Sequence, residues 1–180
     1  MLGKFAPAGV VLAFVAGSLA NQNVLADRVA ALAPGPNGFE LFVVRVTVGV
    51  TMLLHLFLGG VLVALVVTGA RLLLSKNLST YDVTASIAEA HLPLVAWTIW
   101  TAWVLYDSPP ASLDAIRPMV ERLGYFRLLA YAAGVLLLAQ RLAARCNLSG
   151  DEAWAAALPP VCVIVCAMWS TDSLLALLPS

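Results

Sequence analysis

The segment 39–74 is the longest apolar stretch of the chain, and it most narrows the structures that the chain can adopt. As a helix it would extend for about 54 Å, whereas the hydrocarbon core of a bilayer is about 30 Å thick. Glu40 and Arg45 lie near its start, so we expect its first turns to lie among the lipid headgroups. A break at Gly59 and Gly60 would instead give two short pieces. We favour a single membrane-spanning helix that begins at the membrane surface.

The composition of the whole chain agrees with a membrane location. Hydrophobic residues make up 62% of the chain and charged residues 11%, whereas ordinary soluble domains carry about 25% charged residues. The formal net charge is zero, so no basic surface indicates a nucleic-acid partner. The chain is therefore predicted to be an integral membrane protein that contacts the lipid bilayer and no nucleic acid.

Five segments are long and apolar enough to cross a bilayer, for which a helix needs about 20 apolar residues. The first could be mistaken for a secretory signal, but the others already require a membrane, so it is retained as a span. The sequence thus predicts an all-α fold, a polytopic helical bundle that forms a single transmembrane domain over residues 1–180. Its predicted spans are residues 5–26, 42–74, 83–106, 123–143 and 153–178.

Two short basic turns indicate the orientation of the bundle. The turns "RLLLSKN" and "QRLAARCN" contain no acidic residue, and short basic turns stay on the cytoplasmic side. Over the whole chain, the basic residues divide equally between the two sides. The turns therefore decide the prediction, which places the N-terminus inside and the C-terminus outside.

A repeated phrase follows each of these turns, Asn-Leu-Ser and then an acidic residue three positions after the serine. This spacing predicts that Ser79 and Ser149 cap two helices, with Asp82 and Glu152 at the third helical position. Each cap would satisfy amide groups that the start of a helix leaves unpaired, which matters where the next turn enters lipid. Both helices are therefore expected to begin on the same face of the membrane.

Ionisable residues within the third predicted span make it the candidate site. Buried charges in a bilayer are costly, so Glu89 and His91 are functional hypotheses by default. Pro93 removes a backbone hydrogen bond and leaves the carbonyl of Glu89 free, and Pro159 is expected to kink the fifth span in the same way. We expect Glu89, His91 and Pro93 to form an intramembrane polar patch. The structural alternative is that each side chain only bonds a neighbouring helix.

The segments "GARLLLSKNLSTYDVTASIAEAHLPLVAW" and "LLLAQRLAARCNLSGDEAWAAALPPVCVIV" resemble the prokaryotic branch of the Yip family, the Ypt-interacting membrane proteins. The resemblance covers roughly residues 60–169. It implies a small five-span, non-enzymatic bundle for membrane organisation, trafficking or the binding of partner subunits, without a cofactor, in a prokaryotic cytoplasmic membrane. Eukaryotic members engage Rab-type GTPases through a long N-terminal region. Only a few residues precede the first predicted span here, so the resemblance does not imply a GTPase partner for this chain.

Two histidines leave a second interpretation open. The protein could be a redox subunit that binds haem or quinone, or a transport subunit, and in either case it would use His55, His91 and Glu89. Paired histidines can ligate haem. In straight upright helices, however, His91 would lie about 18 Å and His55 about 28 Å from the same face of the membrane. That mismatch opposes shared haem ligation. No catalytic motif occurs in the sequence, so the protein is predicted not to be an enzyme.

Small residues recur every four positions on two of the predicted spans. Gly60, Ala64 and Thr68 do so on the second span, and Ala130 and Gly134 on the fourth. Such faces allow helix backbones to approach closely. They are expected to pack the bundle internally, to bind other membrane proteins or to support self-association.

Overall fold

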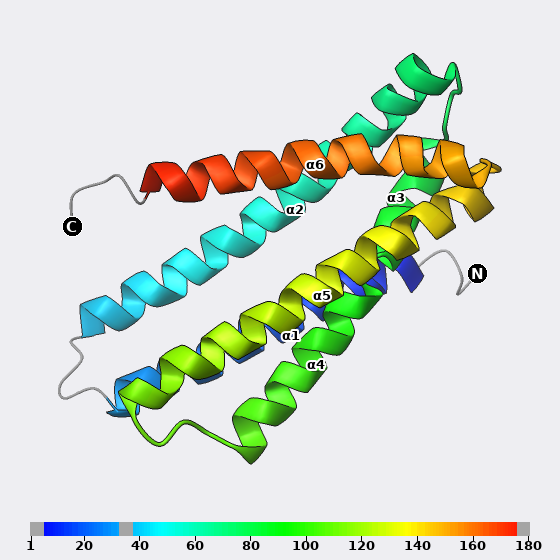
Figure 1. Ribbon diagram of the computed structural model, residues 1–180. Coiled ribbons are helices and arrows are strands. Elements are labelled where there is room, and N and C mark those ends of the chain that lie inside the picture. The colour runs from blue at the N-terminus through cyan, green and yellow to red at the C-terminus, as the bar shows by residue number, and fades with distance from the viewer. Residues whose placement is uncertain (1–5, 33–37, 176–180) are drawn as a thin grey trace. The chain divides into compact units, whose positions relative to one another are not determined.

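The computed structural model describes residues 6–32 and 38–175, and these residues form α-helices and no strand (Figure 1). The all-helical fold expected from the sequence is confirmed. The side chains of Glu40, Arg45 and His55 lie outside the described residues, as do those from residue 164 onward. The helices are α1 (Ala6–Leu32), α2 (Gly38–Leu74), α3 (Thr80–Glu89), α4 (Leu92–Asp107), α5 (Leu113–Cys146) and α6 (Gly150–Leu175).

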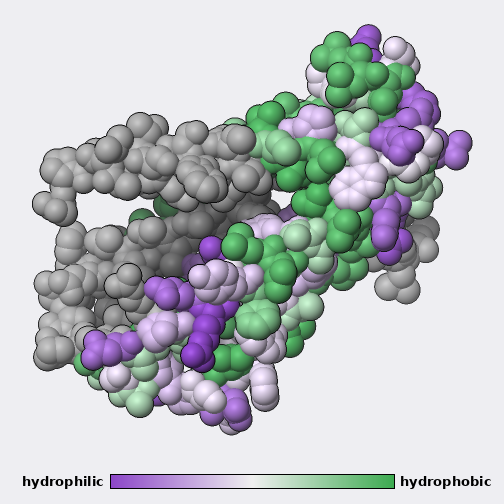
Figure 2. All heavy atoms as spheres, in the orientation of Figure 1, coloured by the Kyte–Doolittle hydropathy of each residue, from purple (hydrophilic) through white to green (hydrophobic). Residues whose placement is uncertain are grey.

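Three segments among the described residues are long and apolar enough to cross a membrane, namely Ala8–Leu32, Phe57–Leu74 and Asp114–Cys146. Large hydrophobic side chains are also exposed on several helices, for example Leu12 on α1 and Leu128 on α5. Figure 2 shows such side chains in green over much of the described surface that it draws. Extensive exposed apolar surface is typical of a protein that contacts lipid or another protein, so the structure fits a membrane location.

The third predicted span is two helices rather than one kinked helix. α3 ends at Glu89 and α4 begins at Leu92, because Pro93 has no amide hydrogen to donate to the carbonyl of Glu89. The intervening turn is held by a hydrogen bond from the His91 amide to the Ala88 carbonyl, 3.1 Å long. By contrast, α2 continues through Gly59 and Gly60, and α6 continues through its internal prolines.

The chain divides into two compact units that share three of the helices. Unit 1 comprises Met1–Leu56 and Ala88–Gly134, and unit 2 comprises Phe57–Ile87 and Val135–Ser180. Unit 1 therefore holds α1, α4 and the first parts of α2 and α5. Unit 2 holds α6, nearly all of α3 and the second parts of α2 and α5.

In unit 1, α1 and α4 pack side by side and run in the same direction. Phe14 lies in a buried cluster with Leu94 of α4, and a Cβ atom added at Gly17 would lie 2.8 Å from the hydroxyl oxygen of Thr98. One turn further along α1, the Asn21 side chain donates a hydrogen bond of 2.8 Å to the Thr98 carbonyl. Later residues of α1 thus contact later residues of α4, as parallel helices require.

α5 packs against α4 in the opposite direction. The indole nitrogen of Trp97 donates to the Leu123 carbonyl at 3.1 Å, and the rings of Trp100 and Phe126 lie 4.6 Å apart between centroids. Toward the other end of the pair, Ala130 joins the cluster that contains Leu94. The tryptophans of α4 thus fix its register on α5.

Unit 2 has a core of its own, made mostly of aliphatic and small side chains. Val66 and Ala70 of α2, Val83 of α3, Leu142 of α5 and Ala156 of α6 are each fully buried. Alanine at such positions lets helix backbones approach closely, which is how helices associate without a hydrophobic driving force in lipid.

Candidate functional site

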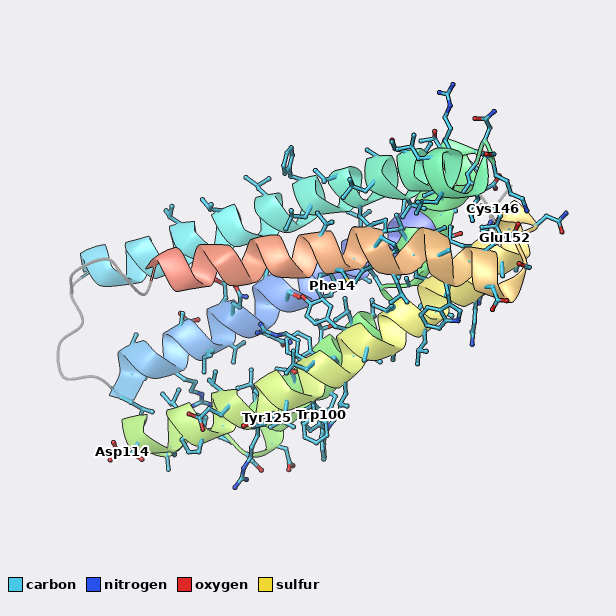
Figure 3. All side chains as sticks on the ribbon, turned by 45° about the horizontal axis from the view of Figure 1, so that its top comes forward. Phe14, Trp100, Asp114, Tyr125, Cys146 and Glu152 are labelled. Carbon is cyan, nitrogen blue, oxygen red and sulfur yellow. The ribbon has the colours of Figure 1, made fainter. Side chains whose placement is uncertain are left out.

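The break between α3 and α4 lies within the helix contacts of unit 1. His91 is half-buried, and its ring centroid lies 5.6 Å from that of Phe14 on α1 (Figure 3 labels Phe14). A Cβ atom added at Gly134 of α5 would lie 2.9 Å from the carbonyl oxygen of Ala90, so only glycine fits without a shift. The helix break is therefore enclosed by α1 on one side and α5 on another.

The predicted polar patch divides between the two helices that meet at this break. Glu89 is the last residue of α3, and one of its carboxylate oxygens is buried. His91 is the N-cap residue of α4, where its side chain makes no capping hydrogen bond, and Pro93 follows in the first turn. A carboxyl group and an imidazole near a helix break can exchange protons or bind a polar ligand.

The other histidine of the redox and transport reading cannot be placed beside this patch. His55 lies on α2, and its side chain lies outside the described residues. Among the residues whose side chains are described, no three His, Cys, Asp or Glu side chains are grouped so that they could hold a metal ion.

The two serines of the repeated phrase each precede a helix in unit 2. The Ser149 hydroxyl accepts a hydrogen bond of 3.3 Å from the Glu152 amide, and the Glu152 carboxylate accepts one of 2.8 Å from the Ser149 amide. The Ser79 hydroxyl accepts a hydrogen bond of 3.4 Å from the Asp82 amide. Ser149 and Glu152 thus form a complete capping box at the start of α6.

The helix that precedes each cap also ends in a similar way. Ser75 after α2 and Asn147 after α5 are the described non-glycine residues with positive φ angles, 55° and 51°. The Leu148 amide then donates to the Ala143 carbonyl, and the Lys76 amide donates to the Ala70 carbonyl. A left-handed residue that closes a helix with such a backward bond is a common C-terminal motif.

An ion pair joins the two turns to each other. The Lys76 ammonium lies 2.7 Å from a carboxylate oxygen of Glu152, and both side chains are partly exposed. Figure 3 shows Glu152 close to Cys146, at the end of unit 2 where α5 gives way to α6. The hydrogen bond from Lys76, and then that from the Ser149 amide, hold the pKa of the Glu152 carboxyl below its usual value.

The ion pair joins corresponding regions of the two repeated phrases. When the phrases are aligned on their serines, Lys76 corresponds to Cys146, and Asp82 corresponds to Glu152. Lys76 of the first phrase contacts Glu152 of the second, so the turns that precede α3 and α6 lie close together in unit 2.

Four polar side chains that lie inside unit 1 were not among the predicted site residues. Ser18, Asn21, Thr98 and Thr101 are each 8% exposed or less. The signal in the sequence is their matched spacing, because both helices carry a pair of polar residues three positions apart, Ser18 with Asn21 and Thr98 with Thr101. A third serine cap was also not predicted: the Ser112 hydroxyl accepts a hydrogen bond of 3.3 Å from the Ala115 amide at the start of α5.

The two predicted small-residue faces lie in different environments. Ala130 and Gly134 of α5 are buried within the chain. Gly60, Ala64 and Thr68 of α2 are exposed, and a Cβ atom added at Gly60 would meet no atom within 4 Å. We refer to these three exposed residues as the α2 stripe.

Comparison with known proteins gives no relative from which a role could be transferred. No family model matches the chain, and neither a curated protein nor a solved structure matches it.

Proposed function

We propose that this chain is a non-enzymatic integral membrane protein that organises the membrane by binding other membrane proteins or a second copy of itself. The observation that carries the proposal is the exposure of the α2 stripe, Gly60, Ala64 and Thr68. Such a role agrees with the resemblance of residues 60–169 to the Yip family, whose members are expected to act without catalysis in membrane organisation or trafficking.

Close helix contacts elsewhere in the chain support this use of the α2 stripe. At Gly17 and Gly134, a neighbouring helix approaches so closely that an added Cβ atom would lie within 3 Å of it. The α2 stripe offers the same small-residue surface without a neighbour. In a bilayer, association depends on packing and not on exclusion of water. A surface that contacts only lipid has no need of small residues at regular spacing.

The accompanying topology is five spans, with the N-terminus inside, in a prokaryotic cytoplasmic membrane. The two basic turns support the orientation. The directions of the helices support the alternation of spans, because α1 and α4 are parallel, whereas α4 and α5 are antiparallel. The first and third spans would then cross in one direction and the fourth in the other.

The substitution Gly60→Leu tests the proposal, with Gly59→Leu as the matched control. A Cβ atom added at either glycine meets nothing within 4 Å, and the two adjacent residues occupy different faces of α2, Gly60 exposed and Gly59 half-buried. Self-association is measured by energy transfer between labelled copies in lipid vesicles. Binding of another protein is measured by cross-linking from a cysteine at position 64 in native membranes.

We expect Gly60→Leu to reduce energy transfer or cross-linking and Gly59→Leu to leave both unchanged. Equal effects of the two substitutions, or no effect of either, would show that the α2 stripe contacts lipid alone.

A transport or redox subunit is the second candidate, favoured by the break between α3 and α4 with its buried Glu89 oxygen. Flux measurements on reconstituted vesicles test transport, which Glu89→Gln should abolish while the protein remains folded.

A visible spectrum of the purified protein tests redox use. A Soret band that disappears in His91→Ala would establish haem binding through this residue, and an unchanged flux together with a featureless spectrum would exclude the candidate.

A further inference from the structure

A small cluster of polar side chains lies inside unit 1, between apolar layers. We call Ser18 and Asn21 of α1 and Thr98 and Thr101 of α4 the polar core; each is 8% exposed or less. On one side it is bounded by the buried cluster of Phe14, Leu94 and Ala130. Further along the helices, Ala26 and Leu105 are again buried. The polar core is thus enclosed within a hydrophobic helix interface.

Only part of the polar core is satisfied by protein atoms. The Asn21 side chain donates to the Thr98 carbonyl at 2.8 Å, and the Thr98 hydroxyl donates to the Val95 carbonyl at 2.7 Å. The Ser18 and Thr101 hydroxyl oxygens are buried and have no hydrogen-bond partner in the protein, and the same holds for the carboxamide oxygen of the neighbouring Gln22.

Other helical hydroxyls in the chain show that a local bond is available. Thr84 and Ser86 of α3 each donate to the carbonyl four residues earlier, at 2.7 Å. Ser18 and Thr101 could bond their own helices in this way, but their hydroxyls do not. Leaving a hydroxyl unpaired in an apolar environment costs about 1–3 kcal/mol, and no surrounding water relieves that cost inside a bilayer.

We propose that the polar core binds water. The ligand must both donate and accept hydrogen bonds, because the unpartnered groups are two hydroxyls and a carboxamide oxygen. No charged side chain belongs to the polar core, so a bound ion would remain uncompensated at a cost of several kcal/mol. An apolar ligand would leave the hydroxyls unpaired. A buried water needs two to four polar partners, and the buried oxygens of Ser18, Thr101 and Gln22 are the described ones in α1 and α4 that have no protein partner.

Water-edited solid-state NMR of the protein in lipid bilayers tests this site. Magnetisation that starts on water is expected to reach the Ser18 and Thr101 side chains as readily as it reaches exposed polar residues such as Ser108. It should not reach Leu94, which is equally buried in the adjacent apolar layer. If Ser18 and Thr101 receive no more than Leu94 does, the site is dry and the proposal is wrong.

Two matched valine substitutions on α4 distinguish bound water from general hydration of the bundle. Thr101→Val removes an unpaired hydroxyl, so the transfer to Ser18 should be lost. Thr98→Val removes a hydroxyl that already bonds Val95, so the transfer to Ser18 should persist. Loss in both variants, or persistence in both, would contradict a site built around Thr101. The signal of Gly124, remote in sequence on α5, reports in each case whether the fold is intact.

Discussion

Ser79 and Ser149 hold the same position at the start of their helices, yet the two caps differ by one methylene group. The carboxylate of Glu152 reaches back to the Ser149 amide at 2.8 Å, and glutamate is the residue that this reciprocal arrangement favours. The aspartate side chain is shorter. At the start of α3 the described hydrogen bond is the one that the Ser79 hydroxyl accepts from the Asp82 amide, 3.4 Å long. The start of α6 is therefore held more firmly than the start of α3.

The substitution Ser149→Ala is expected to lower the free energy of unfolding by about 1 kcal/mol, the usual cost of losing a serine cap. Ser79→Ala should cost a similar amount, because the side-chain bonds that the two substitutions remove are 3.4 Å and 3.3 Å long, and the bond that the Ser149 amide donates to Glu152 survives Ser149→Ala. Denaturation of the two variants in detergent measures both values. Ser149→Asp should retain the stability of the parent chain, because aspartate caps equally well. A loss well above about 1 kcal/mol in only one of the two alanine variants would contradict this expectation.

The stability of unit 2 should depend on pH through Glu152. Its pKa is lowered in the folded state by Lys76 and the Ser149 amide. The carboxylate therefore stabilises the fold above the unfolded-state pKa of about 4.3, and this contribution is lost as the pH falls through the lower folded-state pKa.

Thermal denaturation between neutral and acidic pH measures the dependence on Glu152. Glu152→Gln should flatten the acid limb of the profile, whereas Asp151→Asn, at the exposed neighbouring position, should leave it unchanged. An acid limb that is identical in the parent and in Glu152→Gln would assign the pH dependence to other groups.

At the scale of the helices, close backbone approach determines the packing of unit 1. Gly17 brings α1 onto Thr98 of α4, and Gly134 brings α5 onto the Ala90 carbonyl at the break between α3 and α4. A side chain at either position would separate the helices. The break itself follows from Pro93, so one proline and one glycine together fix how α4 and α5 meet.

Gly134→Ala is expected to destabilise the protein by about 1–2 kcal/mol, because the clash with a backbone carbonyl exceeds the gain in helix propensity. Gly124→Ala is the matched control on the same helix, where an added Cβ atom meets nothing within 4 Å. It should stabilise the protein by up to about 1 kcal/mol. Denaturation in detergent measures both variants, and a stabilising Gly134→Ala would show that α5 lies further from Ala90.

The sequence predicts features that depend on neighbouring residues better than features that depend on packing. Helix ends could be placed from local chemistry, since Ser149 and Glu152 bond each other within one turn. Pro93 predicted a disturbance at Glu89, but its size, a break and not a kink, depends on how α1 and α5 hold the turn. The polar core was not foreseen because Asn21 and Thr98 meet only through the packing of α1 on α4.

At the scale of the whole molecule, the ion pair between the repeated phrases constrains the topology of unit 2. Lys76, after α2, contacts Glu152 in the first turn of α6. The turns that precede α3 and α6 therefore lie close together, and in the proposed five-span topology both would lie on the same side of the membrane.

Single cysteines at positions 79 and 149, in a background without the natural cysteines, should therefore react with an impermeant thiol reagent from the same side of the membrane. The basic turns predict that this side is cytoplasmic, so both should react in inside-out vesicles and neither in intact cells. A cysteine at position 108, at the far end of α4, should react in intact cells. Because the ion pair between Lys76 and Glu152 requires both turns at one surface, reaction of positions 79 and 149 from opposite sides would contradict the proposed five-span topology.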